Sequence, residues 1–177
     1  MINRWIFALT GSRKEKEKRE AIFEFRAKHL SADGRISEKF RDMQTPALFA
    51  IKLGLLPTED SVRKTAEELK SSLIENGYSP RTGFLGTPII LDTFSDTLGD
   101  STTAYNILLQ RGCPGWLYSV DQGATTIWER WNGYTKEHGF GPVAMNSFNH
   151  YAYGAVMGLM YRTMAGIRPG EKGGYKE

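Results

Sequence analysis

The fold of this chain is decided by one stretch, Thr45-Pro-Ala-Leu-Phe-Ala-Ile-Lys-Leu-Gly54, which is apolar on almost every side. Thr45-Pro46 is a helix start signal, because proline lacks an N–H that the first turn leaves unpaired in any case. Gly54 is a stop signal, since glycine adopts the left-handed conformation that ends many helices. A helix that is apolar all round must be covered by other elements. The stretch therefore predicts a buried helix.

The same start signal recurs at Thr87-Pro88, which opens a second strongly apolar segment closed by Gly99. Between the two lies a segment from Pro57 to Gly77 whose apolar residues fall on one face, with acidic residues in its first turn. Helices apolar all round that alternate with one-sided helices fit two layers, the inner covered by the outer. Helical hairpins stacked side by side produce this arrangement.

Start and stop signals predict three more helices and a loop. The helices run from a capping box at Ser12 and Glu15 to Asp33-Gly34, from Ser101 to Gly112, and from Phe148, capped by Ser147, to Ala165 before Gly166; the loop is Asn132 to Val143. No run of alternating β-branched residues is found. The predicted fold class is all-α, in one domain spanning residues 1–177.

Composition excludes several classes of function. A chain of 177 residues with 40% hydrophobic and 24% charged residues is typical of a globular domain. The net charge of +3 comes largely from Arg13 to Arg19, where alternating signs favour a solvated helix face over a nucleic-acid groove. No apolar segment is long enough for a signal peptide or a membrane span. We expect a cytoplasmic protein that binds neither nucleic acid nor membrane.

A metal site is not expected. Cys113 is the single cysteine, and the histidines, His29, His138 and His150, are too far apart in sequence for a familiar zinc spacing. We predict neither a metal nor another cofactor.

The candidate site is Gly123-Ala-Thr-Thr-Ile-Trp-Glu-Arg-Trp-Asn-Gly133. It places Glu129 between Trp128 and Trp131, with Arg130 beside it. A carboxylate among aromatic rings is partly desolvated and suited to exchanging protons with water or substrate. Indole faces stack on sugar rings, and a guanidinium donates to sugar hydroxyls. The stretch predicts a carbohydrate site; the alternative is that the tryptophans are core and Glu129 pairs with Arg130 or Lys136.

His150 is a second candidate, because the predicted helix from Phe148 places it in the first turn, where unpaired N–H groups gather. The alternative is a core histidine bonded to a neighbouring carbonyl. Weaker candidates are Asp92, Asp96, Asp121 and Tyr153.

Several motifs together resemble the α-L-rhamnosidases of glycoside hydrolase family 78. They are Thr82 to Pro88, Gly123 to Trp131, Met145 to Val156 and Tyr161 to Ile167, with Gln44-Thr45 and Gly54 to Pro57 in the same order. The resemblance runs from about Glu20 to Lys176, and residues 1–19 match nothing in the family. It implies part of an (α/α)6 toroid of six helical hairpins.

The resemblance also implies roles. The residue matching Glu129 is the family's general base, and the histidine matching His150 contacts the sugar. Trp128, Arg130 and Trp131 are then expected to bind substrate. The family's general acid lies in an earlier motif, and nothing before Thr82 resembles it.

Three functions remain open. The first is a fragment or subunit of an inverting α-L-rhamnosidase that acts on rhamnose-containing glycans or glycosides. The second is a carbohydrate-binding module without turnover, and the third is a helical-hairpin interaction module. A partial toroid leaves apolar helix faces open, so we expect a homo-oligomer or association with the missing N-terminal half.

Overall fold

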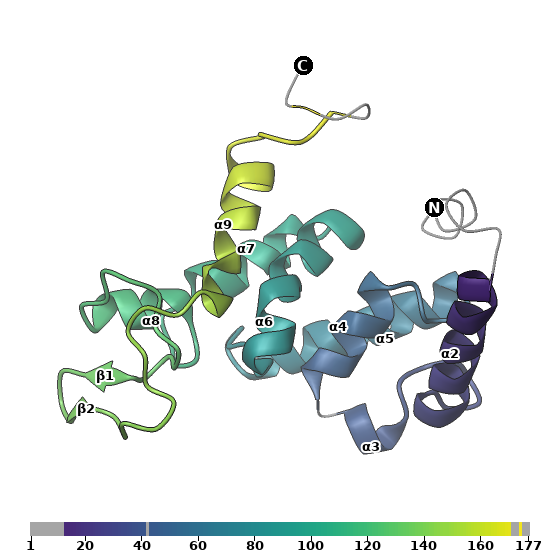
Figure 1. Cartoon of the computed structure of the whole chain (residues 1–177), viewed down its shortest axis with the longest axis horizontal. Coiled ribbons are helices and arrows are strands. Elements are labelled where there is room, and N and C mark those ends of the chain that lie inside the picture. Colours follow the sequence, from purple (N-terminus) through teal and green to yellow (C-terminus); the bar gives the residue numbers. More distant parts are fainter. Residues whose placement is uncertain (1–12, 42, 171–173, 175–177) are drawn as a thin grey trace. The chain divides into compact units, whose positions relative to one another are not determined.

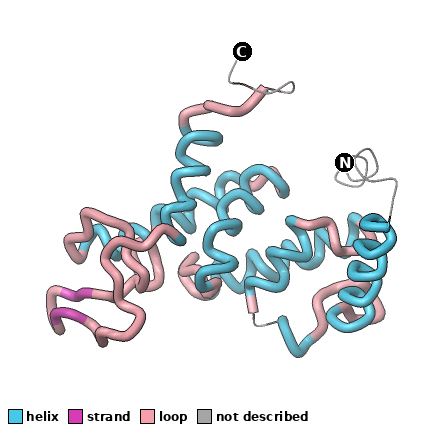
Figure 2. The backbone as a smooth tube through the Cα atoms, viewed as in Figure 1, coloured by secondary structure: helices cyan, strands magenta, loops and turns pink. Residues whose placement is uncertain are grey.

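The computed structural model describes residues 13–41, 43–170 and 174, and it is mostly helical (Figures 1 and 2). The chain divides into two compact units, residues 1–72 and residues 73–177. In the part that the structure describes, no helix is both long and apolar enough to cross a lipid bilayer.

The first unit contains four helices among its described residues. These are α2 (Arg13–His29), α3 (Glu38–Arg41), α4 (Gln44–Lys52) and α5 (Glu59–Glu75), the last of which runs into the second unit. The core of this unit includes Ile36, Leu48, Ala50, Ile51, Leu56 and Leu69.

Helix α2 ends at His29, earlier than predicted, because the following residues form a small turn. Leu30 pairs with Ile36 in an antiparallel bridge, and Gly34 takes a positive φ of 77° at the turn. Asp33 accepts hydrogen bonds from the Ser31 hydroxyl and from the Arg35 backbone amide. The predicted cap at Ser12 lies outside the described residues.

The buried helix predicted from Thr45-Pro46 is confirmed as α4. Leu48 and Ala50 have 0% exposure, and Gly54, with φ of 64°, follows the helix end. The predicted cap is wrong: the helix begins at Gln44, so Thr45 lies inside it, and the capping position, Met43, makes no side-chain cap. Pro46 is accommodated because its missing N–H falls in the first turn.

Helix α5 confirms the predicted one-sided helix. The Thr58 hydroxyl accepts a hydrogen bond of 3.1 Å from the amide of Ser61, which caps the helix start. Acidic residues Glu59 and Asp60 occupy the first turn, and Gly77, with φ of 61°, follows the helix end.

The second unit carries the candidate site. Its elements are α6 (Gly83–Asp92), the π-helical turn η1 (Thr93–Thr97), α7 (Ser101–Leu109), α8 (Trp116–Asp121), strands β1 (Tyr134–Thr135) and β2 (Gly139–Phe140), the 3-10 turn η2 (Ala152–Ala155), α9 (Val156–Leu159) and the π-helical turn η3 (Met160–Met164). Helix α6 packs against α7, η2 and α9. The core of this unit includes Ile90 of α6 and Phe94 of η1, whose exposed fractions are 0% and 1%.

The second start signal, Thr87-Pro88, does not begin a helix. Helix α6 already begins at Gly83, and Pro88 lies inside it. The hydroxyls of Thr82 and Thr87 are hydrogen-bonded to each other at 2.7 Å, so neither caps a helix. Proline inside a helix removes one backbone hydrogen bond, and the burial of Ile90 and Leu91 offsets that loss.

Two predictions for the last third of the chain are corrected. The segment Asn132 to Val143 contains a short hairpin, with Tyr134 opposite Phe140. The last helical segment begins at Ala152 rather than at Phe148, so Ser147 does not cap it and His150 precedes it. Residues 147–150 are not helical, and their backbone is hydrogen-bonded to the candidate segment instead.

Asp100, and not Ser101, caps helix α7, because its carboxylate accepts hydrogen bonds from the Thr103 amide at 3.0 Å and the Thr103 hydroxyl at 2.7 Å. We expect Asp100→Ala to lower the free energy of unfolding by about 1 kcal/mol. Ser101→Ala is the matched control and should change it by less than about 0.5 kcal/mol. Chemical denaturation measures both; equal losses would contradict the assignment of the cap.

Candidate functional site

Two non-helical backbone segments, residues 126–129 and 147–150, form the framework of the site. The amide of Glu129 donates to the carbonyl of Ser147 at 2.8 Å, and the amide of His150 donates to the carbonyl of Ile127 at 2.8 Å. The hydroxyl of Thr126 donates to the carbonyl of Phe148. This pairing brings the Glu129 and His150 segments side by side although they lie far apart in sequence.

The Glu129 carboxylate is oriented by the same pairing. Its Oε2 accepts a hydrogen bond of 2.8 Å from the amide of Ser147, so Glu129 and Ser147 are bonded to each other twice. Within the described residues, Oε1 has no hydrogen-bond partner, and neither Arg130 nor Lys136 forms an ion pair with this carboxylate. One oxygen is therefore held by the backbone while the other remains available, which suits a group that must accept a proton from a fixed direction.

The tryptophans on either side of Glu129 lie in different surroundings. Trp128 is only 7% exposed, and its ring meets Tyr134 and Phe148 edge to face at 6.4 and 5.2 Å. Trp131 is half-buried and stacks in parallel on Tyr153, with ring centroids 4.0 Å apart. Trp128 thus packs into the cluster that supports the loop, and Trp131 belongs to a stacked aromatic pair.

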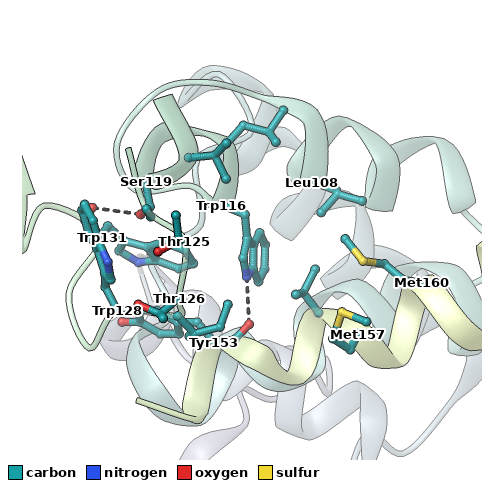
Figure 3. A pocket seen from close by; sticks show the side chains of 15 residues that line it. Leu108, Trp116, Ser119, Thr125, Thr126, Trp128, Trp131, Tyr153, Met157 and Met160 are labelled. Carbon is teal, nitrogen blue, oxygen red and sulfur yellow. Dashed lines mark hydrogen bonds between the residues drawn. The ribbon is translucent and has the colours of Figure 1, made fainter. Parts of the chain in front are cut away.

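Tyr153 is fixed from several sides. Its carbonyl accepts a hydrogen bond of 2.9 Å from the indole Nε1 of Trp116, and the Ser119 hydroxyl holds the carbonyl of Trp131 at 3.0 Å (Figure 3). Burial raises the pKa of the Tyr153 phenol, and the negative charge of Glu129 raises it further. Tyr153 is thus within electrostatic reach of Glu129. Tyr153 is only a weak candidate in the sequence, because its stacking on Trp131 is visible only in the structure.

The His150 ring lies against two other rings, Phe84 at 5.0 Å and Tyr151 at 5.2 Å, both stacked. Its Nδ1 accepts a hydrogen bond of 3.3 Å from the amide of Ala152. In the neutral ring the hydrogen therefore sits on Nε2, which can donate to an acceptor such as a sugar hydroxyl. His150 is half-buried, as a residue at the mouth of a site should be.

Arg130 is half-buried, and its guanidinium makes no hydrogen bond or ion pair with any residue that the structure describes. It is therefore free to bind a ligand. Its backbone carbonyl accepts from the amide of Gly133 at 3.1 Å, which closes the loop after Trp131.

A cavity of about 300 Å³ lies beside this loop (Figure 3). Its walls are mainly aromatic and aliphatic and include Leu108, Trp116, Trp128, Trp131, Tyr153 and Met157. Among the described residues, no group of three histidine, cysteine, aspartate or glutamate side chains is placed to hold a metal ion.

Residues 12–164 match the family model of the bacterial α-L-rhamnosidase six-hairpin glycosidase domain, and the chain belongs to this family. This confirms the all-α fold class expected from helix patterning and the six-hairpin architecture implied by the resemblance to the family.

Relatives and solved structures point the same way. An α-L-rhamnosidase of Formosa agariphila is 40% identical over 94% of this chain and 18% of its own length. An α-L-rhamnosidase of Streptomyces avermitilis is 41% identical over 86% of this chain and 14% of its own length. A crystal structure of the α-L-rhamnosidase from S. avermitilis, complexed with L-rhamnose, matches with a TM-score of 0.76 at 37% identity, covering 85% of this chain and 14% of that one.

The α-L-rhamnosidase of Aspergillus terreus matches with a TM-score of 0.81 at 30% identity, over 89% of this chain and 18% of that one. The chain thus spans less than a fifth of the length of these relatives.

The effect of the Glu129 charge on the pKa of Tyr153 can be tested by titration. Glu129→Gln removes the negative charge and should lower the pKa of Tyr153, because an adjacent anion disfavours the phenolate. NMR of tyrosines labelled with ¹³C at Cζ measures this ionisation residue by residue.

The matched control is Glu137→Gln, whose charge acts on Tyr118 instead. It should lower the pKa of Tyr118 and leave Tyr153 unchanged. An unchanged Tyr153 titration in Glu129→Gln would show that the two groups are not close.

Proposed function

We propose that this chain forms the part of an inverting α-L-rhamnosidase that carries the general base, and that the base is Glu129. Membership of the rhamnosidase family gives the class of reaction. The geometry of the carboxylate carries the assignment: the Ser147 amide holds Oε2, and Oε1 has no partner among the described residues.

In an inverting glycosidase, one carboxylate removes a proton from water while a carboxylic acid protonates the leaving oxygen, with the two groups about 6.5–9.5 Å apart. Glu129 would take the proton of the water. No motif in this chain resembles the family's acid, so we propose that the acid comes from another part of the domain. The substrate would be a terminal α-L-rhamnoside, in keeping with the L-rhamnose bound in the structure of the S. avermitilis relative.

His150, Arg130 and Trp131 would hold the sugar. The Nε2 of His150 and the guanidinium of Arg130 are donors for sugar oxygens. Trp131 presents an aromatic surface for the ring, and Trp128, being nearly buried, would act mainly through the shape of the loop.

Association with the rest of a six-hairpin domain, or with a second copy, is part of the proposal. Several large apolar side chains of the second unit are exposed, among them Leu85 at 71%, Val143 at 99% and Tyr151 at 89%. Exposed apolar surface of this kind is typical of a region that another protein segment covers.

A carbohydrate-binding module without turnover is the second candidate, since the donors just described do not depend on an acid. Rhamnose binding by this chain without hydrolysis in any assembly would favour it.

His150→Ala should weaken the binding of L-rhamnose about 3- to 10-fold, the usual effect of losing one hydrogen bond. Its melting temperature should change little, because the ring is half-buried at the site mouth. Calorimetric titration and thermal unfolding measure the two quantities. His138→Ala is the control, since His138 has 77% side-chain exposure in the hairpin loop, and should alter neither. Equal affinity in wild type and His150→Ala would remove His150 from the site.

Glu129→Gln tests the base directly. Glutamine keeps an oxygen to accept from the Ser147 amide but cannot take a proton from water, so kcat should fall by about 10²–10⁴ while binding survives. The measurement is hydrolysis of an aryl α-L-rhamnoside by the chain joined to the segments of a relative that complete the six-hairpin domain.

Glu137→Gln is the matched control, because Glu137 is 83% exposed in the hairpin loop. A Glu129→Gln variant with near-normal kcat and a lower melting temperature would make Glu129 a structural residue. An inactive wild-type assembly would leave the binding module as the better explanation.

A further inference from the structure

We propose that Tyr153 is a positioning residue of this site, whose hydroxyl forms a hydrogen bond with the water molecule that Glu129 deprotonates. The inference deepens the proposed function and rests on it. The sequence offers Tyr153 only as a weak candidate, and its contacts in the structure carry the proposal.

The Tyr153 ring cannot turn freely. It stacks in parallel on Trp131 at 4.0 Å, with an interplanar angle of 4°, and it meets Phe84 at 5.6 Å. The hydrogen bond from Trp116 to its carbonyl fixes the backbone, and the residue is 6% exposed. The position of the hydroxyl is therefore set by packing, which a positioning group requires.

The rings around Tyr153 connect it to the other candidates. Phe84 touches both Tyr153 and His150, and Trp131 follows Glu129 by two residues on the same loop. Tyr153 thus packs on the loop that carries the proposed base, and it shares the Phe84 ring with the proposed sugar contact.

The hydroxyl also has spare hydrogen-bonding capacity. Within the described part of the chain, the Tyr153 hydroxyl has no hydrogen-bond partner. It is also not one of the fully buried polar atoms that lack a partner. Because burial and the charge of Glu129 both raise its pKa, the phenol keeps its proton at neutral pH. A neutral hydroxyl can both donate to water and accept from it.

The proposed step is a single displacement by water at the anomeric carbon. Water gives one proton to Oε1 of Glu129, and its oxygen forms a bond to the anomeric carbon of the rhamnoside. The bond from that carbon to the glycosidic oxygen breaks, and a carboxylic acid elsewhere in the domain protonates the leaving oxygen. The Tyr153 hydroxyl holds the same water by a second hydrogen bond, so its oxygen is aimed at the carbon. No proton leaves Tyr153.

Tyr153→Phe tests the role, because phenylalanine keeps the ring that stacks on Trp131 and removes only the hydroxyl. In the completed six-hairpin assembly, kcat on an aryl α-L-rhamnoside should fall about 10- to 100-fold, since misplacing a reacting group by about 1 Å has an effect of this size. KM should stay within about twofold, and the melting temperature should not change.

Tyr134→Phe is the matched control. Tyr134 also packs its ring against a tryptophan of the loop, Trp128, at 6.4 Å. Because Tyr134 lies in the hairpin and its ring does not contact Trp131, removing its hydroxyl should leave kcat and KM unchanged. Glu129→Gln in the same assembly reports on the proposed function itself.

The outcomes are distinguishable. Loss of kcat in both Glu129→Gln and Tyr153→Phe, with normal Tyr134→Phe, supports the inference. Loss in Glu129→Gln with normal kcat in Tyr153→Phe overturns the role of Tyr153 and leaves the base in place. A lower melting temperature or a raised KM with normal kcat in Tyr153→Phe makes Tyr153 a packing residue. Full activity of Glu129→Gln, or no activity of the wild type, overturns the proposed function and this inference with it.

Discussion

The double hydrogen bond between Glu129 and Ser147 is the interaction on which the rest of the site depends. One bond joins the two backbones, and the other holds the carboxylate. Together with the bond between His150 and Ile127, it ties residues 147–150 to the candidate segment as a non-helical stretch. A helix starting at Phe148 would use the carbonyl of Ser147 for its own first hydrogen bond, so the amide of Glu129 would lose its acceptor.

Packed aromatic rings stabilise this backbone framework. Trp128 packs edge to face into Tyr134 and Phe148, which keeps the loop and the hairpin together. Trp131 stacks on Tyr153, whose carbonyl is held by Trp116. Rigid rings lose little conformational entropy when packed, so they hold polar groups in place with a small loss of free energy. The site therefore combines one backbone-oriented carboxylate with polar side chains that are held by packed aromatic rings.

In the second unit, ion pairs also connect α6 and η1 to η3 and the residues that follow it. Arg162 in η3 pairs with Asp92 of α6, and Arg168 pairs with Asp96 at 2.9 Å. The sequence offered both aspartates as weak site candidates, and the structure gives them this structural role. These pairs join α6 and η1 to the segment that ends the chain's helical part. Because η2 also packs on α6, these pairs help to fix the helix beside which Tyr153 lies.

The sequence by itself determined the helical class, the buried helix α4, the one-sided helix α5 and the family, because apolar periodicity and motifs are local properties. It also placed Glu129 and His150 among the candidates. Predictions from local signals were wrong at two helix starts. Pro88 lies inside α6, because burial of its neighbours outweighs one lost hydrogen bond. Asp100, and not Ser101, caps α7. Only the tertiary structure decided that residues 147–150 are bonded to the Glu129 segment rather than helical and that Tyr153 stacks on Trp131. Both depend on contacts between residues far apart in the chain, and no local pattern encodes the energy of such contacts.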